Sequence, residues 1–289
     1  MDEQTFETTG SDRLERATAR LGGETLDIVT YRGRSNACQA LVIMFAGRSR
    51  DAEGLVRKAR TLAERNNFAI VAPEMDRERF PTWRYHRAGV AQRTVMQPRE
   101  HWIGPIVNDL IAWARRWTAL PSVGTILFGH SAGGQLLSRV AAYCPPTDID
   151  RIVISNPSVY VAPSLTEMAP HGFAKLFGSE EALIRLQSYV AQPISIYLGC
   201  DDIGAKDLVG NPAARRQGMH RLERGRSVFR QAEALARTQG WHFGWRLVEV
   251  ANVGHSSRGM LAAPEVLTAL GIETAIDHGL SANTSPAAF

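Results

Sequence analysis

A serine between small residues stands near the middle of the sequence, in the segment GHSAG at residues 129–133. This Gly-x-Ser-x-Gly pattern is typical of a tight turn from a strand into a helix, where larger flanking side chains would clash. Such a turn lifts the serine oxygen clear of the sheet, and the helix amides face developing negative charge. The pattern also arises by chance in glycine-rich turns. Here it follows the apolar run TILF and opens the helix-like segment AGGQLLSRVAAY, so we interpret Ser131 as a nucleophile.

A serine hydroxyl needs a base to become nucleophilic, and the base needs a carboxylate to orient it. His255 follows the strand-like segment WRLVEV and precedes a helix-like segment, so we expect it to be the base. For the other seven histidines we prefer structural roles at the surface or in hydrogen bonds. Among them, His130 adjoins Ser131; we expect it to line the substrate site with its ring directed away from the attack position.

The orienting carboxylate is expected just after the strand-like segment ISIYLG, where Asp201 and Asp202 both qualify and Asp207 is a remote third. We prefer Asp202, because the acid usually comes three residues after the glycine that ends the strand, which is Gly199 here. Asp201 remains the alternative, and the acid that does not face His255 would cap the loop.

Two backbone amides are expected to bind the oxyanion formed during attack on a carbonyl. One belongs to Ala132, directly after the nucleophile. The other is assigned to Arg48 in the loop AGRSR, where Gly47 lets the backbone approach the substrate closely. The alternative for Gly47 is a plain turn that leads into the next helix.

An irregular connection over residues 74–98 contains the aromatic residues Trp83 and Tyr85. Long connections are often functional, so we hypothesise that both residues line a substrate pocket. The alternative, that they pack the loop onto the core, is about as well supported.

The elements that must position these residues follow from the hydrophobic pattern. Short apolar runs predict strands, and longer segments with apolar residues on one face predict helices. The strands are expected at 25–31, 39–46, 68–72, 125–128, 149–155, 194–198 and 245–250. The helices are expected at 51–65, 106–117, 132–143, 180–190, 219–238 and 257–270, with a short one at 12–20. This alternation predicts an α/β fold with a mostly parallel central sheet and helices on both faces.

We divide the chain into a lead-in over residues 1–24, one catalytic domain over 25–275 and a flexible tail over 276–289. A small lid insertion is expected within the domain, at 157–192. No internal repeat or break in composition favours a second domain.

Composition excludes several other classes of protein. The net charge is +4 and the pI about 9.2, but arginine supplies 30 of the 33 basic residues and they are spread along the 289-residue chain, so we expect no nucleic-acid partner. The N-terminus lacks a signal pattern, and no apolar run is long enough for a membrane helix. The three cysteines are far apart, which disfavours a disulfide framework. We therefore expect a cytoplasmic protein with no membrane partner; its oligomeric state is not encoded in the motifs.

The motifs GHSAGG and VGHS resemble those of the α/β-hydrolase superfamily, and the likeness extends over about residues 25–270. Within it, AGRSR, FPTWRYHRAGV, YLGCDD, HRLERGRSVF and VGHSSRGM resemble the polyhydroxybutyrate-depolymerase-like or feruloyl-esterase-like hydrolases. The resemblance implies hydrolysis of a small-molecule ester without a metal or organic cofactor, and it does not imply a polymeric substrate. Many relatives carry His-Gly where this chain has Ala46-Gly47. That side chain is not the amide donor, so activity is expected to survive.

Three alternatives remain from the sequence. The same triad could act on an amide, a thioester or a lactone, or pass the acyl group to an alcohol. The fold could serve as a non-catalytic small-molecule receptor, although such proteins usually lack one of the three catalytic residues. A nucleic-acid or interaction module has only the basic pI in its favour.

Overall fold

The structure is a computed structural model that describes residues 7–8, 14–33, 38–120 and 122–272. Within these ranges, nine strands form one sheet in the order β1-β2-β3-β5-β4-β8-β9-β10-β11. They are β1 (Glu7–Thr8), β2 (Leu14–Leu21), β3 (Glu24–Arg32), β4 (Ala40–Phe45), β5 (Phe68–Pro73), β8 (Gly124–His130), β9 (Arg151–Ser155), β10 (Ile194–Gly199) and β11 (Arg246–Val250). A separate hairpin pairs β6 (Ala91–Gln92) with β7 (Val95–Met96).

The sheet is parallel from β5 through β4, β8, β9 and β10 to β11. The pairs β1–β2, β2–β3 and β3–β5 are antiparallel. Strands β4, β5 and β10 are buried at every position, as expected of apolar strands covered on both faces. The predicted strands are thus confirmed, and the carboxyl ends of the parallel strands β5, β4, β8, β9, β10 and β11 meet at one edge of the sheet.

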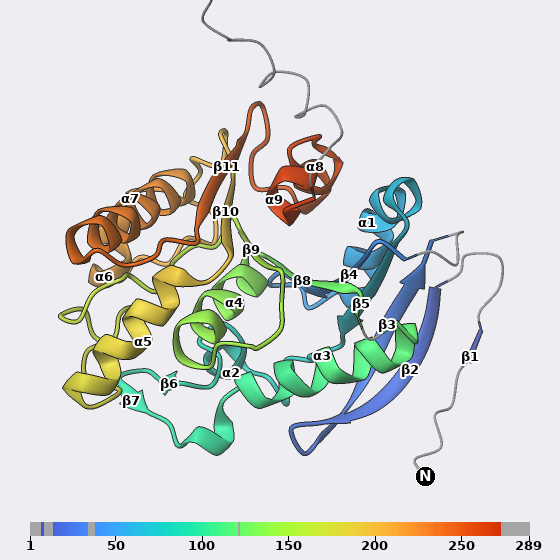
Figure 1. Ribbon diagram of the computed structural model, residues 1–289, viewed down its shortest axis with the longest axis horizontal. Coiled ribbons are helices and arrows are strands. Elements are labelled where there is room, and N and C mark those ends of the chain that lie inside the picture. The colour runs from blue at the N-terminus through green and yellow to red at the C-terminus, as the bar shows by residue number, and fades with distance from the viewer. Residues whose placement is uncertain (1–6, 9–13, 34–37, 121, 273–289) are drawn as a thin grey trace, which may run out of the picture.

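Helices cover both faces of this sheet (Figure 1). One face packs against α1 (Ala52–Asn66), α8 (Ser257–Ala262) and α9 (Val266–Leu270). The other packs against α3 (Gly104–Thr118), α4 (Ala132–Tyr143), α5 (Ser179–Ala191) and α7 (Arg221–Gln239). Two shorter helices, α2 (Thr82–Tyr85) and α6 (Pro212–Gln217), and a 3₁₀ turn at Arg99–His101 lie in the connections. The predicted α/β architecture is confirmed.

Helix α1 shows how local sequence sets an element. The Asp51 carboxylate accepts a hydrogen bond from the Gly54 amide at 2.7 Å, which caps the first turn. The helix ends at Asn67, which adopts a left-handed conformation with φ 51°. The helix predicted at 51–65 begins at this aspartate, so the start of α1 agrees with the prediction.

The helix predicted at 12–20 is wrong, because residues 14–21 form strand β2. Ala17, Ala19 and Leu21 are buried while the residues between them are exposed, and this period of two belongs to a strand. Strand β2 pairs with β3 along its whole length. The segment that we treated as a lead-in therefore contributes to the same sheet as the residues after 24.

The helix predicted at 257–270 is two helices, α8 and α9. They separate at Ala263, whose ψ of 141° is extended, directly before Pro264. A proline disfavours a helical conformation in the residue before it and lacks an amide hydrogen, so the helix cannot continue.

The segment 157–192, where a small lid insertion is expected, contributes residues to the core, and the lid itself stays a prediction. Val159, Tyr160 and Phe173 are almost fully buried, and α5 crosses from β9 to β10 over the sheet. The expected tail at 276–289 lies outside the described residues.

Candidate active site

Ser131 lies in a strained turn between the end of β8 and the start of α4, with φ 57° and ψ −112°. A side-chain carbon at Gly129 would lie 2.4 Å from the Gly133 carbonyl oxygen, and one at Gly133 would lie 2.1 Å from that of Phe45. Both positions therefore require glycine, which is the steric reason given above for the GHSAG pattern. Such strain is typical of functional positions that the surrounding structure holds in place.

A hydrogen-bonded chain joins three side chains from three loops. Nε2 of His255 lies 3.0 Å from Oγ of Ser131, and Nδ1 of His255 lies 2.7 Å from Oδ2 of Asp202. Asp202 is only 2% exposed, whereas the neighbouring Asp201 is exposed. The structure thus brings together the preferred trio and leaves Asp201 outside it. The remote candidate, Asp207, pairs with Arg48 instead.

The end of β10 lets the histidine loop reach the acid. A side-chain carbon at Gly199 would lie 2.3 Å from the Val253 carbonyl oxygen, so glycine permits this close approach. The Asp201 amide donates to the same Val253 oxygen at 3.0 Å, which ties the two loops together. Asp202 and His255 therefore meet although 53 residues separate them.

The second carboxylate oxygen of Asp202 faces a buried arginine. Nη1 of Arg221, the first residue of α7, lies 3.4 Å from Oδ1 of Asp202, and both side chains are 2% exposed. Nη2 of Arg221 also donates to the Lys206 carbonyl at 2.7 Å. The guanidinium therefore orients the acid and the loop that follows it. Sequence reasoning gave Arg221 no role, although it lies in the segment HRLERGRSVF.

His130 lies beside the proposed base rather than on the reaction path. Its Nδ1 is 3.1 Å from Oγ of Ser155, and its ring centroid is 5.0 Å from that of His255. Burial, followed by the nearby His255, lowers the pKa of His130 to about 3. His130 is consequently neutral at neutral pH and adds no positive charge next to a protonated His255.

The two expected oxyanion donors lie at the start of α4 and in the loop after β4. Ala132 is the first residue of α4, so its amide has no acceptor within the helix. Gly47 lies against Ser131: a side-chain carbon there would be 3.7 Å from Cβ of Ser131, an ordinary contact. The backbone at Gly47 therefore tolerates a side chain sterically. The assignment of the oxyanion to the Arg48 and Ala132 amides stays a prediction.

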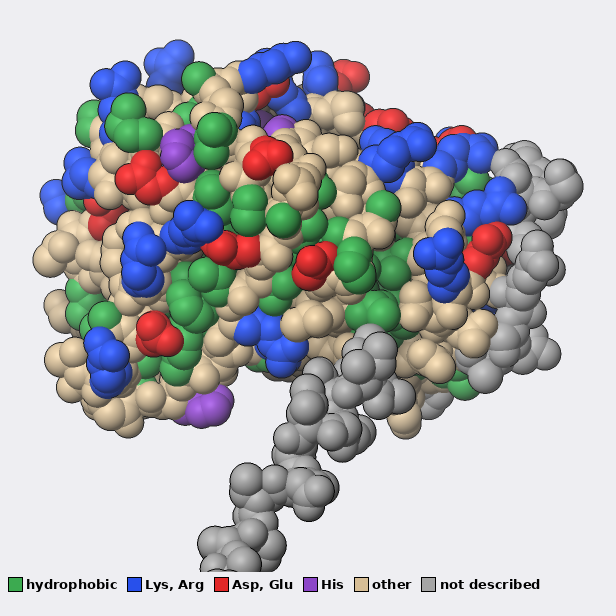
Figure 2. Space-filling model, turned by 90° about the horizontal axis from the view of Figure 1, so that it is seen from above, with side chains coloured by type: hydrophobic (Ala, Val, Ile, Leu, Met, Phe, Trp, Pro, Cys, Tyr) green, Lys and Arg blue, Asp and Glu red, His purple; other side chains and the backbone are tan. Residues whose placement is uncertain are grey.

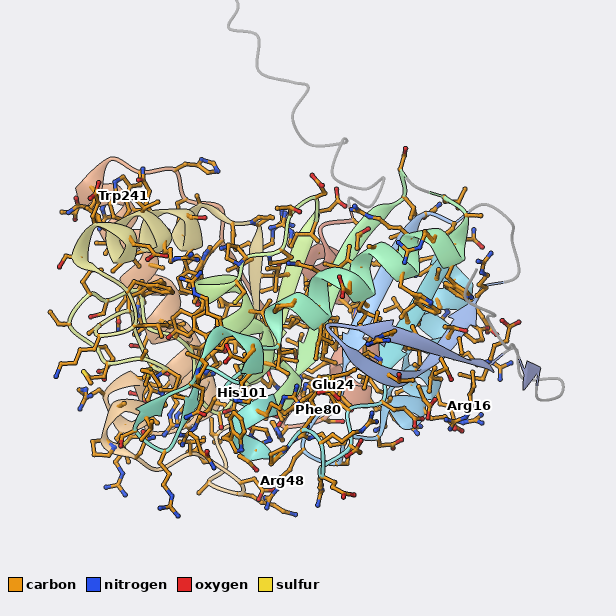
Figure 3. All side chains as sticks on the ribbon, turned by 90° about the horizontal axis from the view of Figure 1, so that it is seen from below. Arg16, Glu24, Arg48, Phe80, His101 and Trp241 are labelled. Atoms are coloured by element: carbon orange, nitrogen blue, oxygen red, sulfur yellow. The ribbon has the colours of Figure 1, made fainter. Side chains whose placement is uncertain are left out.

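A cavity of about 510 Å³ opens over Ser131 and His255. The Arg48 side chain lines it and pairs with Asp207 across its mouth; in Figure 3, Arg48 projects at the lower edge of the molecule. Most of the residues that line the cavity are polar or charged. The lining includes Gly47, Lys58, Thr82, His86, His130, Gln135 and Ser158.

Trp83 and Tyr85 are not among the residues that line this cavity. Tyr85 is buried, donates its hydroxyl to the Ala46 carbonyl at 2.7 Å and stacks under the Arg50 guanidinium. The Trp83 ring contacts that of His101 edge-on. The core-packing interpretation therefore fits both residues better, because one turn of helix α2 directs them away from the opening. Thr82 and His86 from the same segment line the cavity instead.

Ser158 is a cavity residue that sequence reasoning missed. It is 2% exposed, and its Oγ has no hydrogen-bond partner among the described residues. The position of Ser158 just after β9 could have indicated this role from the sequence, because the carboxyl ends of parallel strands gather around a common site. Its hydroxyl can bond a polar group of a ligand.

The described residues include no group of three or more His, Cys, Asp or Glu side chains placed to hold a metal ion. Over the same ranges, no helix combines the length and apolarity needed to cross a bilayer.

The mostly parallel sheet, with the serine turn after β8, the acid after β10 and the histidine after β11, defines the α/β-hydrolase fold. Solved structures bear this out. The poly(3-hydroxybutyrate) depolymerase LpqC from Bordetella parapertussis is similar over 93% of this chain and 94% of its own, at 25% identity and a TM-score of 0.80. Poly(aspartic acid) hydrolase-1 from Sphingomonas sp. KT-1 is similar over 89% of this chain and 94% of its own, at 25% identity and a TM-score of 0.74.

The siderophore hydrolase EstB from Aspergillus nidulans shares the fold alone, at 16% identity and a TM-score of 0.51, over 88% of this chain and 94% of its own. No family model matches the sequence, and comparison with curated proteins gives no match. The resemblance to the α/β-hydrolases is confirmed, and the neighbours support a hydrolase that acts on esters in general.

Proposed function

We propose that the protein hydrolyses a carboxylic ester through an acyl-enzyme on Ser131. One observation carries the proposal: the hydrogen-bonded chain from Ser131 through His255 to Asp202, beneath an open and largely polar cavity. A serine, a histidine and a buried carboxylate in this order are the parts that nucleophilic acyl transfer needs.

In the first step, Oγ of Ser131 attacks the ester carbonyl carbon while Nε2 of His255 takes the hydroxyl proton. Asp202 accepts the hydrogen bond from Nδ1 and stabilises the imidazolium. The carbonyl oxygen becomes an oxyanion, which the amides of Ala132 and Arg48 bind. His255 then gives its proton to the departing alkoxide oxygen as the carbon–oxygen bond breaks, leaving the acyl group on Ser131.

In the second step, water attacks the acyl carbon while His255 again takes a proton. The tetrahedral intermediate collapses, the bond to Oγ breaks, and His255 returns its proton to Ser131. The products are an alcohol and a carboxylic acid. No oxidant, reductant or metal enters this balance.

The test combines chemical labelling with the Ser131→Ala variant. A fluorophosphonate should label the wild type at Ser131, and nitrophenyl esters of varied chain length should be hydrolysed. Ser131→Ala should lower kcat by about 10⁴-fold or more, because the nucleophile and the base act as a unit. Unchanged circular dichroism would show that the variant is folded.

Two results would overturn the proposal. Full esterase activity in Ser131→Ala would remove the serine from the mechanism, and a wild type that takes no label would favour a non-catalytic receptor. Matched nitroanilides belong in the same panel, because one similar structure is described as a poly(aspartic acid) hydrolase. Faster cleavage of the anilides would move the substrate class from esters to amides.

A further inference from the structure

A second groove, of about 710 Å³, runs between α1 and the pair α8–α9. From α1 it is lined at positions 57, 58, 61, 62, 65 and 66, the spacing of one helix face. Lys58 and Arg65 lie at the two ends of this face, about 10 Å apart at the helical rise. The wall formed by α1 thus carries three cations, with Arg57 and Lys58 on one side of Leu62 and Arg65 on the other.

The opposite wall adds a further cation and an apolar surface. Arg258 and Leu261 come from α8, Leu267 comes from α9, and Pro264 lies between these two helices. No aspartate or glutamate is among the described residues that line the groove. Figure 2 shows the molecule from above: Lys and Arg side chains are spread over this face, with Asp and Glu side chains and hydrophobic side chains between them.

The lining cations differ in whether a carboxylate of the described residues pairs with them. Arg57 pairs with Glu53 at the groove edge, at 2.9 Å. For Lys58, Arg65 and Arg258, by contrast, no ion pair with a described carboxylate is present, and all three are exposed. The groove therefore presents uncompensated positive charge over an apolar floor.

The groove adjoins the catalytic cavity. Lys58 lines both spaces, and Arg258 directly follows Ser257, which lines the catalytic cavity beside His255. A chain whose ester bond lies at Ser131 can therefore pass Lys58 and extend along α1 toward Arg65.

We propose that this groove binds a carboxylate-bearing extension of the substrate, so that the preferred ester is an amphiphilic organic anion. Lys58 and Arg258 pair with the carboxylate, and the leucine and proline side chains contact the chain that carries it. Charge complementarity selects the anion, and the apolar floor selects a chain with methylene groups. This inference rests on the proposed ester hydrolysis and specifies its substrate class.

The experiment compares paired esters that differ only at the far end. In one series the acyl chain ends in a carboxylate or a carboxamide, as in the mono-nitrophenyl esters of C4 to C10 dicarboxylic acids and their amides. In the other series the same pair of groups lies on the alcohol side. In at least one series kcat/KM should favour the carboxylate by about tenfold, and the preference should weaken as ionic strength rises.

The double variant Lys58→Gln/Arg258→Gln should lose most of that preference. Arg237→Gln is the matched control: Arg237 is an exposed cation in the last turn of α7. Trp241, just beyond that helix, lies at the upper left of Figure 3, whereas Arg48 lies at its lower edge. The control should keep the preference unchanged.

A binding measurement separates this inference from the proposed function. Suberate, titrated into the Ser131→Ala variant by calorimetry, should bind, and the added glutamine substitutions should weaken its binding about tenfold. Equal cleavage of carboxylate and carboxamide esters would overturn the inference while leaving ester hydrolysis intact. If no ester were cleaved, the suberate titration would still decide whether the groove binds carboxylates, and unchanged binding in the double variant would reject it.

Discussion

At the scale of single residues, the site is organised around one buried carboxylate. Asp202 has His255 on one oxygen and the Arg221 guanidinium on the other, so both of its acceptor sites face a partner. Burying a charge is costly unless it is paired and hydrogen-bonded. This pairing explains how a carboxylate can sit at 2% exposure behind the histidine.

The two adjacent acids give a matched pair of variants. Asp202→Asn should lower kcat by about 10³- to 10⁴-fold, because the amide cannot hold His255 in the required tautomer or stabilise its charge. Asp201→Asn should change kcat by less than roughly twofold, since the Asp201 side chain is exposed. Steady-state kinetics on a nitrophenyl ester measures both. The reverse order of effects would assign the acid to Asp201.

At the scale of elements, buried arginines of α7 hold the loop that carries the acid. Arg224 donates to the carbonyls of Gly218 at 2.9 Å and Val209 at 2.8 Å, and Val209 lines the catalytic cavity. Arg221 donates to the Lys206 carbonyl in the same loop. The loop after β10 has little regular structure, and these bonds to its backbone position the residues that face the site.

The serine turn makes a prediction about stability. Gly133→Ala should destabilise the fold by about 2–3 kcal/mol or prevent folding, because its added carbon would overlap the Phe45 carbonyl between α4 and β4. Gly204→Ala is the control, since a carbon there meets nothing within 4 Å. Urea unfolding followed by circular dichroism measures the difference. Equal stability of the two variants would contradict the close contact between the turn and β4.

At the scale of the whole molecule, histidines that the fold keeps neutral link stability to pH. Burial lowers the pKa of His130 to about 3, that of His86 to about 4 and that of His171 to about 3. In the unfolded chain an ordinary histidine has a pKa of about 6.5. Between these values the unfolded chain binds protons that the folded chain does not, so stability falls as the pH falls below about 6.5.

His130→Gln should reduce this pH dependence. From pH 7.5 to pH 5 the wild type should lose about 2 kcal/mol more stability than the variant, which is the linkage expected for one histidine. His242→Gln, at an exposed position, provides the control and should follow the wild type. Denaturant unfolding at the two pH values gives the numbers; parallel losses in His130→Gln and the wild type would mean that His130 is protonated in the folded state.

The sequence alone determined the order of strands and helices and the positions of the serine turn and of His255. These features depend on local chemistry: the period of apolar residues, the Asp51 cap and the small residues around Ser131. The same local reasoning failed at residues 14–21, where a short polar-apolar alternation was interpreted as a helix although pairing with β3 makes it a strand.

The tertiary structure alone decided which acid faces His255, where Trp83 and Tyr85 point, and that a basic groove adjoins the cavity. Each of these depends on segments far apart in the chain. The register of β10 beside β11, with Gly199 opposite Val250, brings the two loops together and turns Asp202 inward. Packing of α1 against α8 places Lys58 and Arg258 on facing walls. The local sequence pattern does not show which distant segments will come into contact. The free energy that stabilises such contacts is gained only when the whole chain is folded.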